Sequence, residues 1–387
     1  WLVWWWFIML LATVFQLGGM VGGVGQALTR AFPSVSPALA QSLESSLPRV
    51  AEAIGSRPEH PWAVLTAFVA IILLLSGGYR RIERVTTFLV VSVTFVTIAC
   101  VAMLPAMGFP VGWRDIQHGF SLDILMLPAG AIAAAFGAFG ITGVGASELY
   151  AYPYWCIEKG YARSTGRRNQ SPEWTQRARG WMRVMYLDAW VSMIVFTIAT
   201  VAFYVLGATV LHRQGLNPEK SKMMETLSEM YVPTFGEWSK IAFLIGAWAV
   251  LFKTLYVASA SNSRLTADFL NISKIVRFQA AEDRARWIRY GCIFYPILAL
   301  VFYLWWGDPK AMVVLGGFFQ AATLPIISGA AVFLRYRRLD PRIAPSRWFD
   351  ACLWFAFVTI TIVAIYAISS WGMENLWPLI APRFQGK

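Results

Sequence analysis

The chain has 387 residues, of which 57% are hydrophobic and only 14% are charged, with a mean hydropathy of +0.54 and a formal net charge of +12. Soluble domains carry about 25% charged residues, so this composition excludes a soluble globular protein. The basic residues lie in loops between apolar segments, which also excludes the basic face on a soluble fold that nucleic-acid binding requires.

Blocks of apolar residues long enough to cross a bilayer, about 20 residues each, recur along the chain. They predict an all-α, polytopic membrane protein with one transmembrane domain over 1–387 and the lipid bilayer as its partner. Nineteen Trp and fourteen Tyr support this prediction, because amphipathic rings collect at membrane interfaces. The nine predicted membrane segments are 1–28, 61–77, 85–107, 129–157, 184–211, 239–263, 290–306, 311–334 and 350–371.

The polar stretch after the first segment, 29–60, is rich in Pro and Ser and is expected to hold a short surface helix near 41–54. The chain opens on Trp1 directly into an apolar segment. We therefore expect that an N-terminal part precedes it.

Lysine and arginine divide the loops into two sides. The loops 78–84, 158–183, 264–289 and 335–347 hold 21 of the 33 basic residues, whereas the loops between them hold 11. Basic residues concentrate on the cytoplasmic side of membrane proteins. We therefore predict a multi-pass protein of the cell inner membrane, with the start of the chain inside and the C-terminus outside.

The segment 129–157 is predicted to be a broken helix. Glycine weakens a helix and proline removes a backbone donor. Broken helices near the middle of the membrane form the substrate sites of many secondary transporters. The residues that indicate the break are Gly140, Gly143 and Gly145, followed by Ser147, Glu148 and Tyr150, and then Pro153.

Glu148, Asp188 and Lys253 are charged residues within the predicted membrane segments 129–157, 184–211 and 239–263. A carboxylate such as Glu148 costs about 3 kcal/mol at membrane depth and needs a partner, for which a cation in transit is one candidate. The alternatives are a structural pair with Lys253 or an arginine, or a protonated carboxyl group. Lys253 either reaches toward the interface or pairs with Glu148 or Asp188. Asp188 is expected to be a helix-start or packing carboxylate, with a place in an ion pathway as the alternative.

Two glutamines are candidates for an ion pathway. Gln320 and Thr323 stand in an apolar segment next to Pro325, where oxygen donors beside a kink would face a cation. Hydrogen bonding between helices is the alternative. Gln16 stands in the glycine-rich part of the first segment, where small residues indicate close contact between helices.

The candidate ligands are carboxylate, amide, hydroxyl and carbonyl oxygens, which suit magnesium, calcium or manganese better than soft metals. The three histidines fall in predicted loops, and the chain carries no nucleotide fingerprint and no nucleophile–base arrangement. We therefore predict that the protein is not an enzyme and uses no cofactor. A divalent ion is its expected transported substrate.

The order of the segments resembles the Nramp family of divalent metal transporters, which have the LeuT-type inverted-repeat fold. The resemblance covers most of the chain and begins at what would be the family's third helix, with the sequence WLVWWWFIMLLATVFQLGGMVGG. YRRIERVTTFLV resembles the turn between the fourth and fifth helices. GITGVGASELYAYPYW occupies the place of the broken sixth helix, RVMYLDAW the start of the seventh, and TLPI a Gln-Leu-Pro stretch of the tenth.

Departures from the family pattern change what the resemblance implies. The family's Asp-Pro-Gly-x-Asn motif would precede Trp1. The Met-Pro-His motif of the sixth helix is absent, and Ser147, Glu148 and Leu149 stand near the place of its methionine. Oxygen in place of a thioether implies a harder ion, as in the Nramp-related magnesium transporters. Gln16 and Gly19 replace the family's proton-pathway acids, which implies uncoupled or differently coupled transport.

We therefore predict a secondary transporter of divalent metal ions, magnesium or manganese, that works by alternating access. Glu148 would neutralise the ion, while Ser147, Tyr150 and Thr323 would orient or coordinate it. Backbone carbonyls near Gly143 and Gly145 would complete the shell. Two alternatives stay open, namely an amino-acid or amine transporter of the same fold, and a non-transporting membrane sensor or subunit.

Overall fold

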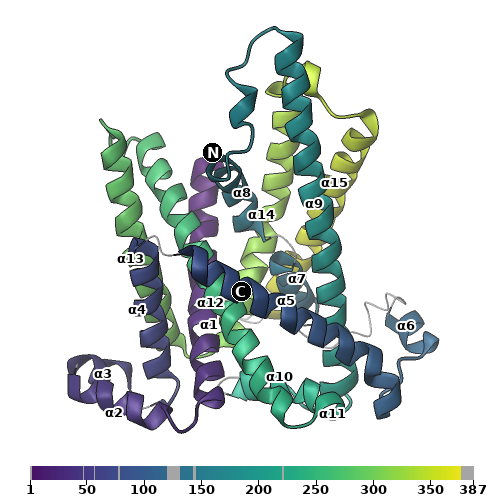
Figure 1. Ribbon diagram of the computed structural model, residues 1–387. Coiled ribbons are helices and arrows are strands. Elements are labelled where there is room, and N and C mark those ends of the chain that lie inside the picture. The colour runs from purple at the N-terminus through teal and green to yellow at the C-terminus, as the bar shows by residue number, and fades with distance from the viewer. Residues whose placement is uncertain are drawn as a thin grey trace, which may run out of the picture. The chain divides into compact units, whose positions relative to one another are not determined.

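The computed structural model describes residues 2–46, 48–55, 57–76, 79–119, 131–142, 145–219 and 222–375, and every regular element in these ranges is a helix (Figure 1). Eight helical stretches there are long and apolar enough to cross a membrane. They comprise α1 (Leu2–Ala31), α5 (Tyr79–Met103), α7 (Ala131–Ile141) with α8 (Ala146–Glu158), α9 (Pro172–Leu206), α12 (Trp238–Ile272), α13 (Ala281–Trp306), α14 (Pro309–Arg337) and α15 (Arg347–Asn375).

The remaining predicted segment, 61–77, corresponds to α4 (His60–Ser76), a shorter apolar helix of 17 residues. At 1.5 Å per residue it spans about 25 Å. The predicted polytopic, all-α architecture is therefore confirmed. The shorter elements are α2 (Ser36–Ser46), α3 (Pro48–Ile54), η1 (Leu104–Met107), α6 (Trp113–Gly119), η3 (Arg163–Thr165), η4 (Gly207–Leu211), α10 (Met223–Ser228), η6 (Glu229–Tyr231), α11 (Val232–Phe235) and η7 (Pro341–Ile343).

Several helices extend beyond the apolar segments that predicted them. α9 begins at Pro172 rather than at 184, and α12 continues to Ile272 rather than ending at 263. The predicted bounds mark where the hydropathy of the sequence falls, whereas the helical hydrogen bonds continue into the polar residues beyond. The stretch 29–60 holds two helices instead of one, because Pro48 begins α3 and proline is favoured at a first helical position.

The described chain groups into two compact units. One unit draws on Thr13–Leu122 and Ile198–Leu315, and in it α12 packs against α13, α5 and α4 (Figure 1). Gly18 and Gly22 of α1 lie against α13 in this unit. A methyl group added at Gly22 would overlap the Tyr303 ring, and one at Gly18 would lie 3.0 Å from the carbonyl oxygen of Ala299. The predicted close contact through these glycines is confirmed, whereas the single domain over 1–387 stays a prediction.

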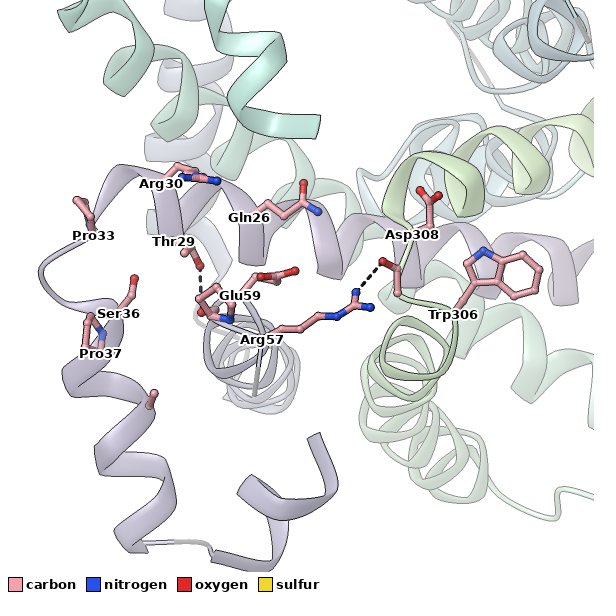
Figure 2. Close-up of a pocket in the computed structure, with 13 residues that line it drawn as sticks. Gln26, Thr29, Arg30, Pro33, Ser36, Pro37, Arg57, Glu59, Trp306 and Asp308 are labelled. Atoms are coloured by element: carbon pink, nitrogen blue, oxygen red, sulfur yellow. Dashed lines mark hydrogen bonds between the residues drawn. The ribbon is translucent and has the colours of Figure 1, made fainter. Parts of the chain in front are cut away.

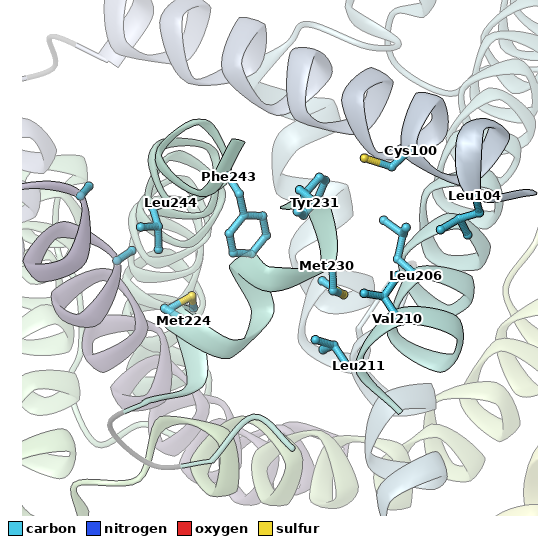
Figure 3. Close-up of a cluster of buried hydrophobic side chains, with 12 residues drawn as sticks. Cys100, Leu104, Leu206, Val210, Leu211, Met224, Met230, Tyr231, Phe243 and Leu244 are labelled. Atoms are coloured by element: carbon cyan, nitrogen blue, oxygen red, sulfur yellow. The ribbon is translucent and has the colours of Figure 1, made fainter. Parts of the chain in front are cut away.

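A second cluster in this unit packs around Tyr231 (Figure 3). Tyr231 is 1% exposed and lies among side chains of α5, α9 and α12, including Cys100, Leu206 and Phe243. Its hydroxyl oxygen lies 2.8 Å from Oγ1 of Thr97 on α5. Thr97 Oγ1 already donates to the carbonyl of Val93 at 2.7 Å, so the Tyr231 hydroxyl is the donor. The segment α10–α11 is thereby anchored to α5.

Tyr231→Phe is expected to lower the free energy of unfolding by about 1 kcal/mol, the net worth of one buried hydrogen bond. Tyr231→Ala is expected to lower it by about 3–5 kcal/mol, because a cavity is added to the loss. Thr97→Val is expected to lower the free energy of unfolding at least as much as Tyr231→Phe, since it leaves the buried Tyr231 hydroxyl unpaired. The double variant is expected to lose less than the sum of the two single losses. Thermal melting in detergent of the wild type, the three single variants and the double variant Thr97→Val with Tyr231→Phe measures this. Strictly additive effects of Thr97→Val and Tyr231→Phe would contradict the predicted bond.

The other unit draws on Trp1–Ala12, Asp123–Thr197 and Gly316–Lys387. In it α7 packs on α15, and its core contains Phe136, Phe318, Ala321, Ala364 and Ala367. α14 runs as one helix through Pro325, so the helix is not interrupted beside Gln320 and Thr323.

In the same unit, the turn between α14 and α15 is organised by Asp340, which is 6% exposed. Its carboxylate accepts hydrogen bonds from the backbone N–H and the guanidinium of Arg342 and pairs with Arg168 at 2.9 Å. These contacts hold the pKa of Asp340 well below its ordinary value, chiefly through the Arg342 side chain. Arg179 donates to the Arg342 carbonyl, which joins this turn to the start of α9.

Candidate functional site

The predicted break in the segment 129–157 is present. α7 ends at Ile141 and α8 begins at Ala146. Gly145, at the cap of α8, has an extended backbone with φ −64° and ψ 157°. Gly143 lies outside the described residues, so its predicted part in the ion shell stays a prediction.

Glu148 lies in the first turn of α8 and caps the start of that helix. Its Oε2 atom accepts the Gly145 N–H at 3.2 Å. A carboxylate is favoured there because a helix N-terminus carries partial positive charge. Glu148 is exposed, and among the described residues it forms no ion pair and no further hydrogen bond. Its other oxygen, Oε1, is therefore available to a ligand.

Three oxygen atoms of different kinds surround Gly145. The Gln320 side chain reaches the break from α14, where its Oε1 atom accepts the Ser147 N–H at 3.3 Å. A methyl group placed on Gly145 would lie 3.3 Å from the same Oε1 and 3.6 Å from the carbonyl oxygen of Gly140. Together with the Glu148 carboxylate, these atoms form a carboxylate, amide and carbonyl oxygen set of the kind that hard cations prefer.

Gln320 is 1% exposed and Thr323, one turn later, is 4% exposed. Thr323 Oγ1 donates to the Gln320 carbonyl at 2.7 Å, so its hydroxyl hydrogen is used within α14 and only its oxygen lone pairs remain for a ligand. The Tyr150 hydroxyl is buried and has no hydrogen-bond partner among the described residues. An ordered water or a ligand at this position would satisfy it.

The carbonyl of Gly145 is less available to an ion than expected. It accepts the N–H groups of Glu148 and Leu149 at 3.0 and 3.3 Å, because it starts the hydrogen bonding of α8. The last carbonyls of a helix, in contrast, lack intrahelical donors. The C-terminal end of α7, with the Gly140 carbonyl near the cap, is therefore the better source of backbone oxygen.

The remaining predicted residues have partners elsewhere. Lys253 Nζ donates to Thr87 Oγ1 of α5 at 2.7 Å, so its partner is a hydroxyl group rather than the carboxylate considered from the sequence. Asp188 on α9 accepts the Tyr152 hydroxyl of α8 at 3.0 Å, which fits its expected packing role. Gln16 is buried at 7% exposure on α1. A pathway role for these three residues stays a prediction.

The described ranges contain no cluster of three or more His, Cys, Asp or Glu side chains that could hold a metal ion. A cation at the break would therefore be bound by one carboxylate and several neutral oxygens.

A separate cavity of about 1110 Å³ lies at the end of α1 in the other unit (Figure 2). It is lined by residues of both charges, including Arg30, Arg57, Glu59 and Asp308, and Arg57 donates to the Gly307 carbonyl. This mixed charge does not favour a cation site.

Sequence reasoning missed the glycine of α14 that brings α7 close to Gln320. A methyl group at Gly317 would overlap the Gly137 carbonyl oxygen, and one at Gly140 would overlap the Gly317 carbonyl oxygen. The backbones of α7 and α14 are therefore in contact. In the sequence, the Gly316–Gly317 doublet just before Gln320 indicates this contact, because small residues let two helices approach closely.

A comparison with protein families matches residues 1–370 to the family model described as natural resistance-associated macrophage protein-like, Nramp. A comparison with curated proteins finds no match.

Proposed function

Because this chain belongs to the Nramp family, which implies transport of divalent metal ions, we propose that it carries a hard divalent cation, magnesium or manganese, at the break between α7 and α8. The observation that carries this proposal is the oxygen set around Gly145. Glu148 supplies the negative charge, and Gln320 and the Gly140 carbonyl supply neutral oxygens. Such donors suit magnesium and manganese better than soft metals.

In the structure, two of these oxygens accept backbone N–H groups. Glu148 Oε2 accepts from Gly145 and Gln320 Oε1 accepts from Ser147. An arriving cation competes with these N–H donors for the oxygens. Ion binding would therefore change the hydrogen bonds that hold the break. The ion then favours one conformation of the break over the other, which alternating access requires. Ser147, Tyr150 and Thr323 would orient or coordinate the ion.

The same geometry weighs against an amino-acid substrate. A substrate carboxylate would need the N-terminus of α8, but the Glu148 carboxylate already occupies that position. A second negative charge there would be repelled, whereas a cation would be attracted. The sensor alternative differs in a single respect, since it predicts no flux of any ion.

The decisive test is uptake by the full chain in proteoliposomes. We expect uptake of magnesium or manganese and none of amino acids, driven by the ion gradient and an inside-negative potential. We also expect no accompanying acidification of the lumen, because transport is proposed to be uncoupled from protons. Matched liposomes without protein are the control. Amino-acid uptake, or thermal stabilisation by amino acids and not by divalent salts, would reject the metal substrate, and the absence of any flux would favour the sensor.

A further inference from the structure

The end of α14 and the start of α15 are clamped together by side chains. Arg335 forms a bidentate pair with Asp350, with N–O distances of 2.7 and 2.8 Å, and both side chains are 17% exposed. A second contact lies nearby, where the Trp354 indole N–H donates to the Tyr336 hydroxyl at 3.3 Å. These two contacts bring the last turn of α14 and the first turns of α15 to one edge of the unit.

Three arginines stand at this edge without an acidic partner among the described residues. Arg337 ends α14 and Arg338 follows it, while Arg347 begins α15, and all three are exposed. The nearest acids along the chain are already neutralised, since Asp340 pairs with Arg342 and Arg168 and Asp350 pairs with Arg335. The edge therefore presents uncompensated positive charge.

Exposed aromatic rings accompany these cations. Tyr336 is 54% exposed and Trp348 is 79% exposed. Both lie where the apolar sequences of α14 and α15 meet polar loop, on the side that the charge bias assigns to the cytoplasm. Tyrosine and tryptophan rings favour the headgroup level of a bilayer, and long basic side chains reach the interface from helix ends. This edge therefore lies at the depth of lipid phosphates.

We propose that this edge is a binding site for an anionic phospholipid of the cytoplasmic leaflet. The lipid phosphate accepts hydrogen bonds from Arg337, Arg338 and Arg347, whose planar guanidinium groups suit bidentate contact with phosphate oxygens. The rings of Tyr336 and Trp348 lie beside the glycerol and upper acyl region. The site does not depend on the transported substrate and stands whether or not the proposed function holds.

The test compares lipid binding by the full chain and by a triple variant, Arg337→Gln with Arg338→Gln and Arg347→Gln. Native mass spectrometry in detergent measures retention of phosphatidylglycerol against phosphatidylcholine. The wild type is expected to prefer phosphatidylglycerol, and the triple variant to bind it about 10- to 100-fold more weakly. The matched control is Arg49→Gln with Arg114→Gln and Lys222→Gln, which removes three exposed positive charges from loops assigned to the opposite side.

Retention of the lipid preference in the 337/338/347 variant, or its loss in the control variant, would overturn the proposal. Equal binding of both lipids by the wild type would also overturn it. Glycerol phosphate is added as a competitor, and displacement of the lipid by it at comparable concentration would assign the site to a soluble anion instead. Melting curves of both variants establish that each one is folded, so that lost binding reports on the site.

Discussion

Glu148→Gln is expected to lower divalent-cation uptake about 100-fold, because metal affinity depends on the number of charged ligands. The glutamine oxygen can still accept the Gly145 N–H, so the start of α8 and the break itself are retained. What is lost is the one negative charge among the oxygens around Gly145. The measurement is the initial rate of magnesium or manganese uptake into proteoliposomes over a range of ion concentrations.

Glu158→Gln is the matched control, since it makes the same chemical change at the other end of α8. Its uptake is expected to stay near that of the wild type. Melting temperatures of both variants distinguish lost transport from lost folding. Unchanged uptake in Glu148→Gln would remove this carboxylate from the mechanism, and equal losses in both variants would indicate a general effect of charge on α8.

Gly317→Ala is expected to destabilise the fold by about 1–3 kcal/mol or more, the usual cost of overpacking a tight core. The added methyl group would overlap the Gly137 carbonyl oxygen, which is backbone and cannot rotate away. α7 would have to move from α14, and Gln320 would then lose its register with the Ser147 N–H. Uptake is therefore expected to fall together with the melting temperature.

Gly180→Ala is the control for this change. Gly180 lies in α9 and has no atom within 4 Å of an added methyl group. Alanine there is expected to stabilise the helix by about 0.5–1 kcal/mol, the ordinary gain over glycine in a helix interior. Melting curves and the monodisperse fraction after extraction compare the two variants. An equal or higher melting temperature in Gly317→Ala would show that α7 and α14 are not in backbone contact.

Local sequence predicted the features that depend on neighbouring residues. Apolar length determined the membrane segments, and the glycines before Ser147 indicated where the helix breaks. The same few residues placed Glu148 at the break, and the structure puts it in the first turn of α8. Helix ends were less predictable, as α9 and α12 show, because hydropathy reports on the surroundings of a residue and not on its hydrogen bonding.

Only the tertiary structure decided which side chains meet. Gln320 reaches the break across 173 residues of sequence, and Lys253 finds Thr87 across 166. Such pairings depend on how closely two helices approach, and for Gln320 the approach of α14 to α7 is set by Gly317 through a contact between backbones. The sequence by itself thus determined an all-helical membrane protein with an interrupted helix and a carboxylate at the interruption. Packing determined which neutral oxygens join that carboxylate, because ligands from separate helices come together only where the helices touch.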